Sequence, residues 1–206
     1  MKDFPITQGL LDLITNLPAT MDQTKVLEYV NAGINHYKDE LNRAVGESNL
    51  ESAIIGFYEL MDENSDTMDQ ETKNRISCRK GCAHCCHLFV SVSMREAVVI
   101  KGHCDDNDIL IDKEYLKKQS NYKQKDYSLQ ENSACVFLND SNECKIYNVR
   151  PLACRKYFVI SDPDLCDAKK YPSGIVAKVS DINAELMASA MVDGENSLSQ
   201  SLLKII

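Results

Sequence analysis

The sequence predicts a mainly α-helical protein with a small α+β region that is rich in cysteine and stabilised by metal. Three observations lead to this fold class. Apolar residues recur at helical spacing before and after the middle of the chain, all nine cysteines follow residue 76, and residues 135–147 have the composition of a β-hairpin. We therefore expect a helical N-terminal region at residues 1–75, a cysteine-cluster domain at residues 76–172, and C-terminal helices at residues 173–206 that pack on the rest.

The N-terminal region is expected to form three helices. In the first, the apolar residues keep to helical spacing and stop before Pro18. The second spans Asp22 to Val45 and carries one apolar stripe on an otherwise polar surface, and the third begins at Leu50. The acidic run from Asp62 to Glu71 is expected to be a solvated connection or a helix end. Packing accounts for this region, so no site is predicted there.

Residues 78–87 hold four thiols and two imidazoles within ten residues. A thiolate is a soft, anionic ligand for zinc or iron–sulfur clusters, and short spacings let one turn of backbone aim two sulfurs at a common point. Thiols this crowded are prone to oxidation unless they are occupied, so the loop predicts a metal site. Because consecutive side chains diverge, the neighbours Cys85 and Cys86 favour a loop between two sites or a multinuclear centre.

A helix is expected directly after this loop, because Ser93 and Glu96 have the spacing of a capping box. Gly102 is expected to help end that helix. The following residues, 105–126, are polar and poorly periodic, and they predict a loop with at most a short helix around Tyr115.

A turn-forming segment, Asn139 to Asn142, separates two apolar stretches and predicts a hairpin with a four-residue loop. In that register Phe137 lies opposite Cys144. Cys135 and Cys144 then share one face of the hairpin, about 7–8 Å apart at Cα, and are expected to converge on one centre. A slip of one residue would separate them.

The segment after the hairpin adds two more thiols. Pro151 is expected to start a helix with Cys154 in its first turn, where the helix dipole would lower the pKa of the thiol. Cys166 follows in a predicted loop. Helical periodicity returns at residues 181–192 and 197–206.

The chain carries a formal net charge of −8 and has a pI near 5.0. Nucleic acids and anionic membranes require a cationic face, so neither is an expected partner. The sequence has no apolar stretch long enough for a membrane helix and does not begin with a signal-peptide pattern. We therefore expect a cytoplasmic protein in which the nine cysteines are reduced and bind metal. A disulfide framework is the alternative, and the odd count would leave one thiol unpaired.

These residues resemble the YkgJ-type CxxCxxCC cysteine-cluster family, which is described as zinc- or iron-chelating. The resemblance covers residues 76–172 and rests on two strings, Cys78-x3-Cys82-x2-Cys85-Cys86 and Cys144-Lys-Ile-Tyr-x2-Arg-Pro-x2-Cys154-Arg. Cys135 precedes the second string, and Cys166 matches the trailing cysteine of the family. The resemblance thus implies eight metal ligands: Cys78, Cys82, Cys85, Cys86, Cys135, Cys144, Cys154 and Cys166.

The residues near these thiols are expected to play supporting roles. Arg150 and Arg155 stand inside the family motif, so we expect them to contact the cofactor, either by balancing the charge of the thiolates or by holding an anionic substrate. His84 and His87 are expected to support the ligands or to lie at the surface. Cys104 lies away from both strings and is expected outside the centre.

Two functions remain open. In the first, an iron–sulfur or polynuclear iron centre serves a redox step or the modification of a protein or peptide substrate. In the second, zinc staples a non-catalytic module that binds a protein partner. Eight thiolates are twice what one tetrahedral zinc or one cubane cluster needs, and the spacing fits both metals. A flagellin lysine N-methylase in the wider family carries a similar cluster, but this chain lacks the glycine-rich loop of a Rossmann site. No catalytic residue is predicted.

Overall fold

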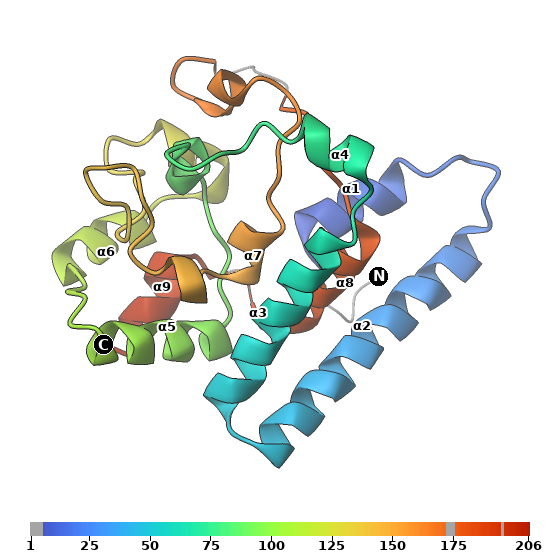
Figure 1. The fold of residues 1–206 in the computed structure, drawn as a ribbon, viewed down its shortest axis with the longest axis horizontal. Helices are drawn as coiled ribbons and strands as arrows, with labels where there is room; N and C mark the ends of the chain where they lie inside the picture. Colours follow the sequence, from blue (N-terminus) through green and yellow to red (C-terminus); the bar gives the residue numbers. More distant parts are fainter. Residues whose placement is uncertain (1–5, 172–175, 195) are drawn as a thin grey trace.

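A computed structural model of the chain describes residues 6–171, 176–194 and 196–206 (Figure 1). Regular structure in these residues is almost entirely helical, which confirms the mainly α fold class. The α-helices are α1 (Gln8–Thr15), α2 (Gln23–Glu47), α3 (Leu50–Asp66), α4 (Gln70–Arg75), α5 (Met94–Asp106), α6 (Lys113–Ser120), α7 (Leu152–Arg155), α8 (Ile182–Met191) and α9 (Leu198–Leu203). Four 3-10 turns accompany them: η1 (His84–His87), η2 (Gln124–Leu129), η3 (Tyr147–Val149) and η4 (Pro163–Cys166).

The two long helices α2 and α3 form an antiparallel pair that diverges from its connection, and α8 packs against both (Figure 1). Asp22 and Asn49 cap their N-termini, as polar residues at these positions do in isolated helices. Gly33 allows the close approach of α2 to α8, because a Cβ atom there would lie 2.7 Å from Leu186 Cδ1. The three N-terminal helices expected from the sequence are thus present, and a C-terminal helix completes their core.

Two apolar cores hold the described residues together. The smaller one joins α1, α2 and α8 through six buried side chains: Leu10, Ile14, Val30, Ile34, Leu186 and Ala190. The larger one is built around α3, α5, α8 and α9, and it also takes in Phe137, Ile146 and Leu152 from the cysteine-rich segments. These segments are therefore anchored by apolar burial as well as by their thiols.

Helix α5 begins at the capping box of Ser93 and Glu96, as the sequence predicts. The expectation that Gly102 helps end this helix is wrong, because α5 continues to Asp106. Ile100 and Cys104 lie on its core side, with exposed fractions of 0% and 1%. Their burial outweighs the cost of about 1 kcal/mol for a glycine inside a helix.

The predicted β-hairpin is not confirmed, although its turn forms. Leu138 N–H donates to the carbonyl of Cys135, so the first segment is itself a turn, and only an isolated bridge joins Leu138 to Cys144. The predicted pairing of Phe137 with Cys144 is therefore wrong by one residue. The Asn139 side chain is the reason, since its Oδ1 accepts the N–H of Glu143 at 2.8 Å and shortens the loop.

None of the helices in residues 6–171, 176–194 and 196–206 combines the length and the apolar character that crossing a membrane requires.

Candidate metal centre

Four segments carry the eight cysteines of the predicted centre, and hydrogen bonds tie these segments together. The backbone N–H of Cys135 donates to the carbonyl of Cys86 at 2.7 Å. The backbone N–H of Val159 donates to the sulfur of Cys78 at 3.3 Å. The turns η1 and η4, which hold Cys85 and Cys166, contact each other. In Figure 1 α7, which carries Cys154, and the other three segments lie above α5 and α9.

The thiols fall into two neighbourhoods, as their electrostatic partners show. In the first, burial raises the pKa of Cys78 and of Cys166, and the negative charge of Cys82 and of Cys85 raises both further. We call Cys78, Cys82 and Cys166 the first thiol group. Cys166 also interacts with Cys78, so all three members are mutual neighbours.

In the second neighbourhood, burial raises the pKa of Cys154 well above the usual value, and Cys135, Cys85 and Cys144 add to this effect. Burial raises the pKa of Cys135 to about 12, with Cys144 and Cys85 again contributing. We call Cys135, Cys144 and Cys154 the second thiol group. Cys85 interacts with members of both groups and lies next to Cys86, whose hydrogen bond raises the pKa of Cys85 further than burial does.

The sequence led us to expect a lowered pKa for Cys154, and this expectation is wrong. Helix α7 spans only the four residues Leu152–Arg155, so its dipole is small, whereas burial of the thiol penalises the charged form strongly. The thiols whose pKa is raised in this way, such as Cys135 and Cys154, stay protonated at neutral pH until a metal displaces the proton. Metal binding at these sulfurs therefore releases protons.

The donor set fits zinc or iron by its chemistry. All nine cysteines are free thiols, and sulfur is the donor that both zinc and iron–sulfur centres use. Within residues 6–171, 176–194 and 196–206, no three Cys, His, Asp or Glu side chains already converge on a single point as metal ligands. The eight cysteines of the predicted centre would therefore have to close in on the ion when it binds.

Arg155 connects the cysteine-rich region to α3. Its side chain is only 3% exposed and forms an ion pair with Asp62 of α3. The same guanidinium donates to the carbonyls of Asn148 and Arg150 and lies 4.4 Å from the ring centre of Tyr58. Its donors are thus committed to protein groups, which gives Arg155 a structural role beside Cys154.

Replacing Arg155 with alanine is expected to lower the free energy of unfolding by about 3 kcal/mol, because the carbonyls of Asn148 and Arg150 lose a charged donor that is itself buried and the Tyr58 ring loses its cation. Urea unfolding would measure the loss. Arg95→Ala is the matched control, since Arg95 is exposed and its guanidinium donates to Asn42, which is also exposed, and it should change stability by less than about 0.5 kcal/mol. Equal effects of the two substitutions would contradict the role assigned to Arg155.

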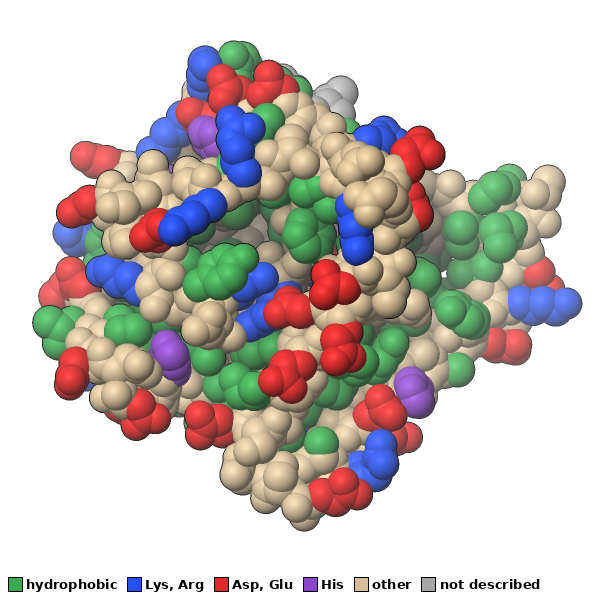
Figure 2. All heavy atoms as spheres, viewed as in Figure 1, with side chains coloured by type: hydrophobic (Ala, Val, Ile, Leu, Met, Phe, Trp, Pro, Cys, Tyr) green, Lys and Arg blue, Asp and Glu red, His purple; other side chains and the backbone are tan. Residues whose placement is uncertain are grey.

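Arg150 acts electrostatically on Cys144, and its side chain is 18% exposed. Its guanidinium is 3.9 Å from the ring centre of Tyr147 and 3.8 Å from a carboxylate oxygen of Asp62. Its positive charge acts to lower the pKa of Cys144, although burial raises that pKa overall. Figure 2 shows acidic side chains over α3 next to basic ones from the cysteine-rich side of the molecule. Arg150 is therefore positioned to offset the charge of the second thiol group.

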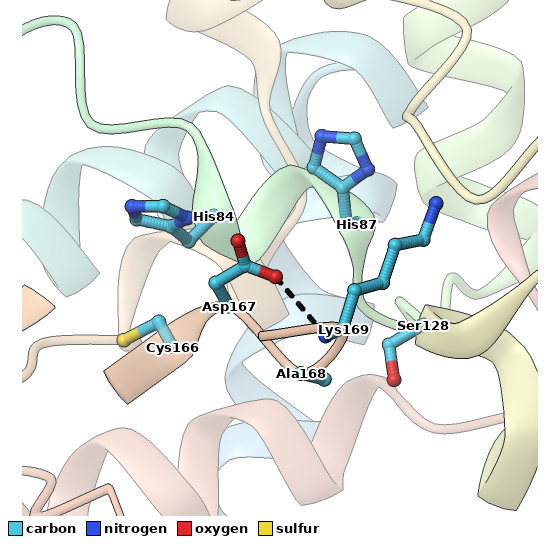
Figure 3. A pocket seen from close by; sticks show the side chains of 7 residues that line it. All are labelled: His84, His87, Ser128, Cys166, Asp167, Ala168 and Lys169. Carbon is cyan, nitrogen blue, oxygen red and sulfur yellow. Dashed lines mark hydrogen bonds between the residues drawn. The ribbon is translucent and has the colours of Figure 1, made fainter. Parts of the chain in front are cut away.

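A surface hollow of about 140 Å³ lies against Cys166 (Figure 3). It is lined by His84, His87, Ser128, Cys166, Asp167, Ala168 and Lys169. Asp167 Oδ1 accepts the backbone N–H of Lys169 at 3.0 Å and so shapes the turn that forms one wall. The ring of His87 faces Ser133 Oγ at 3.3 Å, and burial lowers the pKa of its imidazole, with the charge of Lys169 adding to that effect.

Comparison with known proteins agrees with the chemistry of this region. Residues 77–172 match the sequence model of the CxxCxxCC family, which is described as "Putative zinc- or iron-chelating domain". We refer to residues 77–172, the stretch that this model matches, as the CxxCxxCC domain. No curated protein and no solved structure matches the chain.

Cys104 also falls within the CxxCxxCC domain but lies apart from both thiol groups. It is buried in α5 with an exposed fraction of 1%. Burial raises its pKa to about 11, and the charges that act on it come from Asp105 and Lys101, not from another cysteine.

Three more residues lie near the second thiol group or beside its neighbouring arginines: Tyr58, Asp62 and Glu96. The first two come from α3, outside the CxxCxxCC domain, and nothing in the spacing of the cysteines points to them. Glu96 was identified only as a capping residue. Its Oε1 also accepts the backbone N–H of Leu152 at 2.9 Å, which fixes the start of α7.

Proposed function

We propose that the CxxCxxCC domain holds iron or zinc through its eight clustered thiolates, arranged as two neighbouring centres. The observation that carries this proposal is the division of six cysteines into two groups of three, with Cys85 interacting with both. Each group of three thiolates needs one further thiolate to reach four sulfur ligands, the number that a tetrahedral zinc ion or a cubane cluster requires.

The adjacent pair Cys85 and Cys86 supplies the two missing ligands in this proposal. Side chains of consecutive residues point in different directions, so one of the pair can turn to the first thiol group while the other turns to the second. The pair lies in η1, which contacts η4, and Cys86 also accepts the backbone hydrogen bond from Cys135. The segment thus touches both sets of ligands.

We favour iron, in an iron–sulfur or polynuclear centre used for a redox step or for the modification of a protein or peptide. The hollow beside Cys166 supports this choice, because structural zinc sites are closed whereas a reactive centre keeps a route to the surface. Nine reduced thiols also suit the cytoplasm, where we place the protein.

A non-catalytic, zinc-stapled module that binds a protein partner is the second candidate. It is favoured by the lack of strands in the described part of the CxxCxxCC domain, whose long connections form isolated bridges in place of a sheet. Segments of this kind commonly depend on a structural metal for their fold.

Anaerobic purification of the full chain, followed by metal analysis and visible absorption, separates the two candidates. We expect bound iron and broad sulfur-to-iron absorption, because thiolate ligands to iron give colour whereas zinc does not. A colourless protein with two zinc ions per chain would overturn the iron proposal and support the staple. A protein without bound iron or zinc would contradict both.

A further inference from the structure

Tyr58 is a buried residue whose hydroxyl group has no hydrogen-bond partner among the residues that the structure describes. The side chain lies in α3 with an exposed fraction of 1%. A buried phenol normally finds an acceptor for its O–H, since an unsatisfied polar group costs about 1–3 kcal/mol. We therefore expect this hydroxyl to donate a hydrogen bond to an acceptor that becomes able to receive it in another state of the protein.

The surroundings of Tyr58 narrow the choice of that partner. Helix α3 packs against α7, and the guanidinium of Arg155 lies 4.4 Å from the centre of the Tyr58 ring. Burial raises the pKa of the hydroxyl, and the charged groups that act on it are Glu96, Arg155 and Cys154. Of these three groups Arg155 has no acceptor atom, which leaves the Glu96 carboxylate and the Cys154 sulfur as the candidates to receive the hydrogen.

Glu96 is already occupied by other donors. Its Oε2 accepts the backbone N–H of Ser93 at 3.1 Å and the Ser93 hydroxyl at 3.0 Å, and its Oε1 accepts the N–H of Leu152. The Cys154 thiol, in contrast, is affected by burial and by nearby charges, with no hydrogen-bond donor from the described residues among them. As a thiol it is a weak acceptor, but as a thiolate it becomes a strong one.

We propose that Tyr58 is a positioning residue that donates its O–H to the sulfur of Cys154 once that sulfur binds a metal as a thiolate. This inference rests on the proposed function, in which Cys154 belongs to the second thiol group. Such a hydrogen bond withdraws electron density from the sulfur and holds the ligand in place. It would also tie a helix outside the CxxCxxCC domain directly to the metal centre.

The substitution Tyr58→Phe tests the inference, with cobalt(II) bound to the full chain as a spectroscopic probe. We expect the sulfur-to-cobalt charge-transfer band to move to lower energy, because the thiolate loses a hydrogen bond. We also expect cobalt to be lost to a chelator about tenfold faster than from the unaltered protein. In the metal-free chain the same substitution should leave the stability unchanged or higher, since it removes an unsatisfied hydroxyl.

Tyr37→Phe is the matched control, because Tyr37 packs edge-on against Phe57 and no cysteine is among the groups that act on its hydroxyl. It should leave the cobalt band unchanged. If Tyr58→Phe leaves both the band and the rate of cobalt loss unchanged in a protein that shows the band, this inference fails and the proposed function stands. A loss of stability in metal-free Tyr58→Phe would also overturn it, since the hydroxyl would then have an internal partner. Absence of any thiolate band in the unaltered protein would overturn both.

Discussion

Serine at Cys82 or at Cys144 is expected to remove about half of the bound metal, whereas serine at Cys104 should leave the metal content unchanged. Cys82 belongs to the first thiol group and Cys144 to the second, so each substitution removes one ligand from a different centre. A serine hydroxyl does not replace a thiolate as a metal ligand. Removing a residue that only hydrogen-bonds to a ligand lowers metal affinity roughly 10–100-fold, and removing the ligand itself should lower it more. Metal analysis after extensive dialysis would measure the content.

Cys104→Ser is the control for this experiment because it makes the same change of atom at a buried cysteine outside both groups. The double variant Cys82→Ser/Cys144→Ser should lose nearly all of the metal if the two centres are separate. Loss of metal in Cys104→Ser but not in the other two variants would overturn the ligand assignment. Complete loss in each single variant would instead indicate one multinuclear centre that needs every thiolate.

The helices could be predicted from the sequence because their signals are local. Asp22 caps α2, and the capping box of Ser93 and Glu96 starts α5, at positions where the residue types alone predict a helix end. The prediction for the end of α5 is wrong because the tendency of Gly102 to end a helix is weaker than the stabilisation that burial of the neighbouring side chains provides. Ile100 and Cys104 continue the core side of the helix past the glycine, and only the tertiary packing shows this.

The turn between residues 139 and 142 was predicted correctly, but the pairing around it was not. Turn composition identifies a turn without deciding how many residues it closes. Here one side-chain acceptor, Asn139 Oδ1, captures the N–H groups of Ser141 and Glu143 and shifts the pairing by one residue. Cys135 and Cys144 nevertheless interact electrostatically, because a tight turn, and not a shared strand face, brings them together.

The thiols of the candidate site could be found from sequence because cysteines are rare and their spacing is informative. The environment of these thiols could not be predicted from the sequence, since it depends on residues far away in the chain. The pKa of Cys154 is governed by burial of the thiol more than by the short helix that carries it. Asp62 and Tyr58 reach Arg155 only through the packing of α3 on α7. The hollow at Cys166 likewise forms only where η1 meets η4.

Removing the metal with a chelator is expected to strip amide protection from residues 77–92 and 134–147 while α2 and α8 keep theirs. The two segments contain few backbone hydrogen bonds of regular structure, and the link from Cys135 to Cys86 joins loop to loop. Metal ligation can supply on the order of 10 kcal/mol to small folds, so its loss should exceed the effect of any single substitution in the core. Hydrogen exchange with and without chelator would measure the change.

The apolar side chains of these segments should limit how far the segments unfold when the metal is removed. Phe137 and Ile146 are buried in the larger core, so we expect them to hold the segments near α5 after the metal is gone, in a dynamic and not a fully unfolded state. Helices α2 and α8 also pack against each other through Ile34 and Leu186 in the smaller core, which contains no thiol and serves as the internal control. Return of protection when the metal is restored would show that the change is reversible. Full thermal stability and full protection of the two segments in the chelated protein would count decisively against a metal-dependent fold.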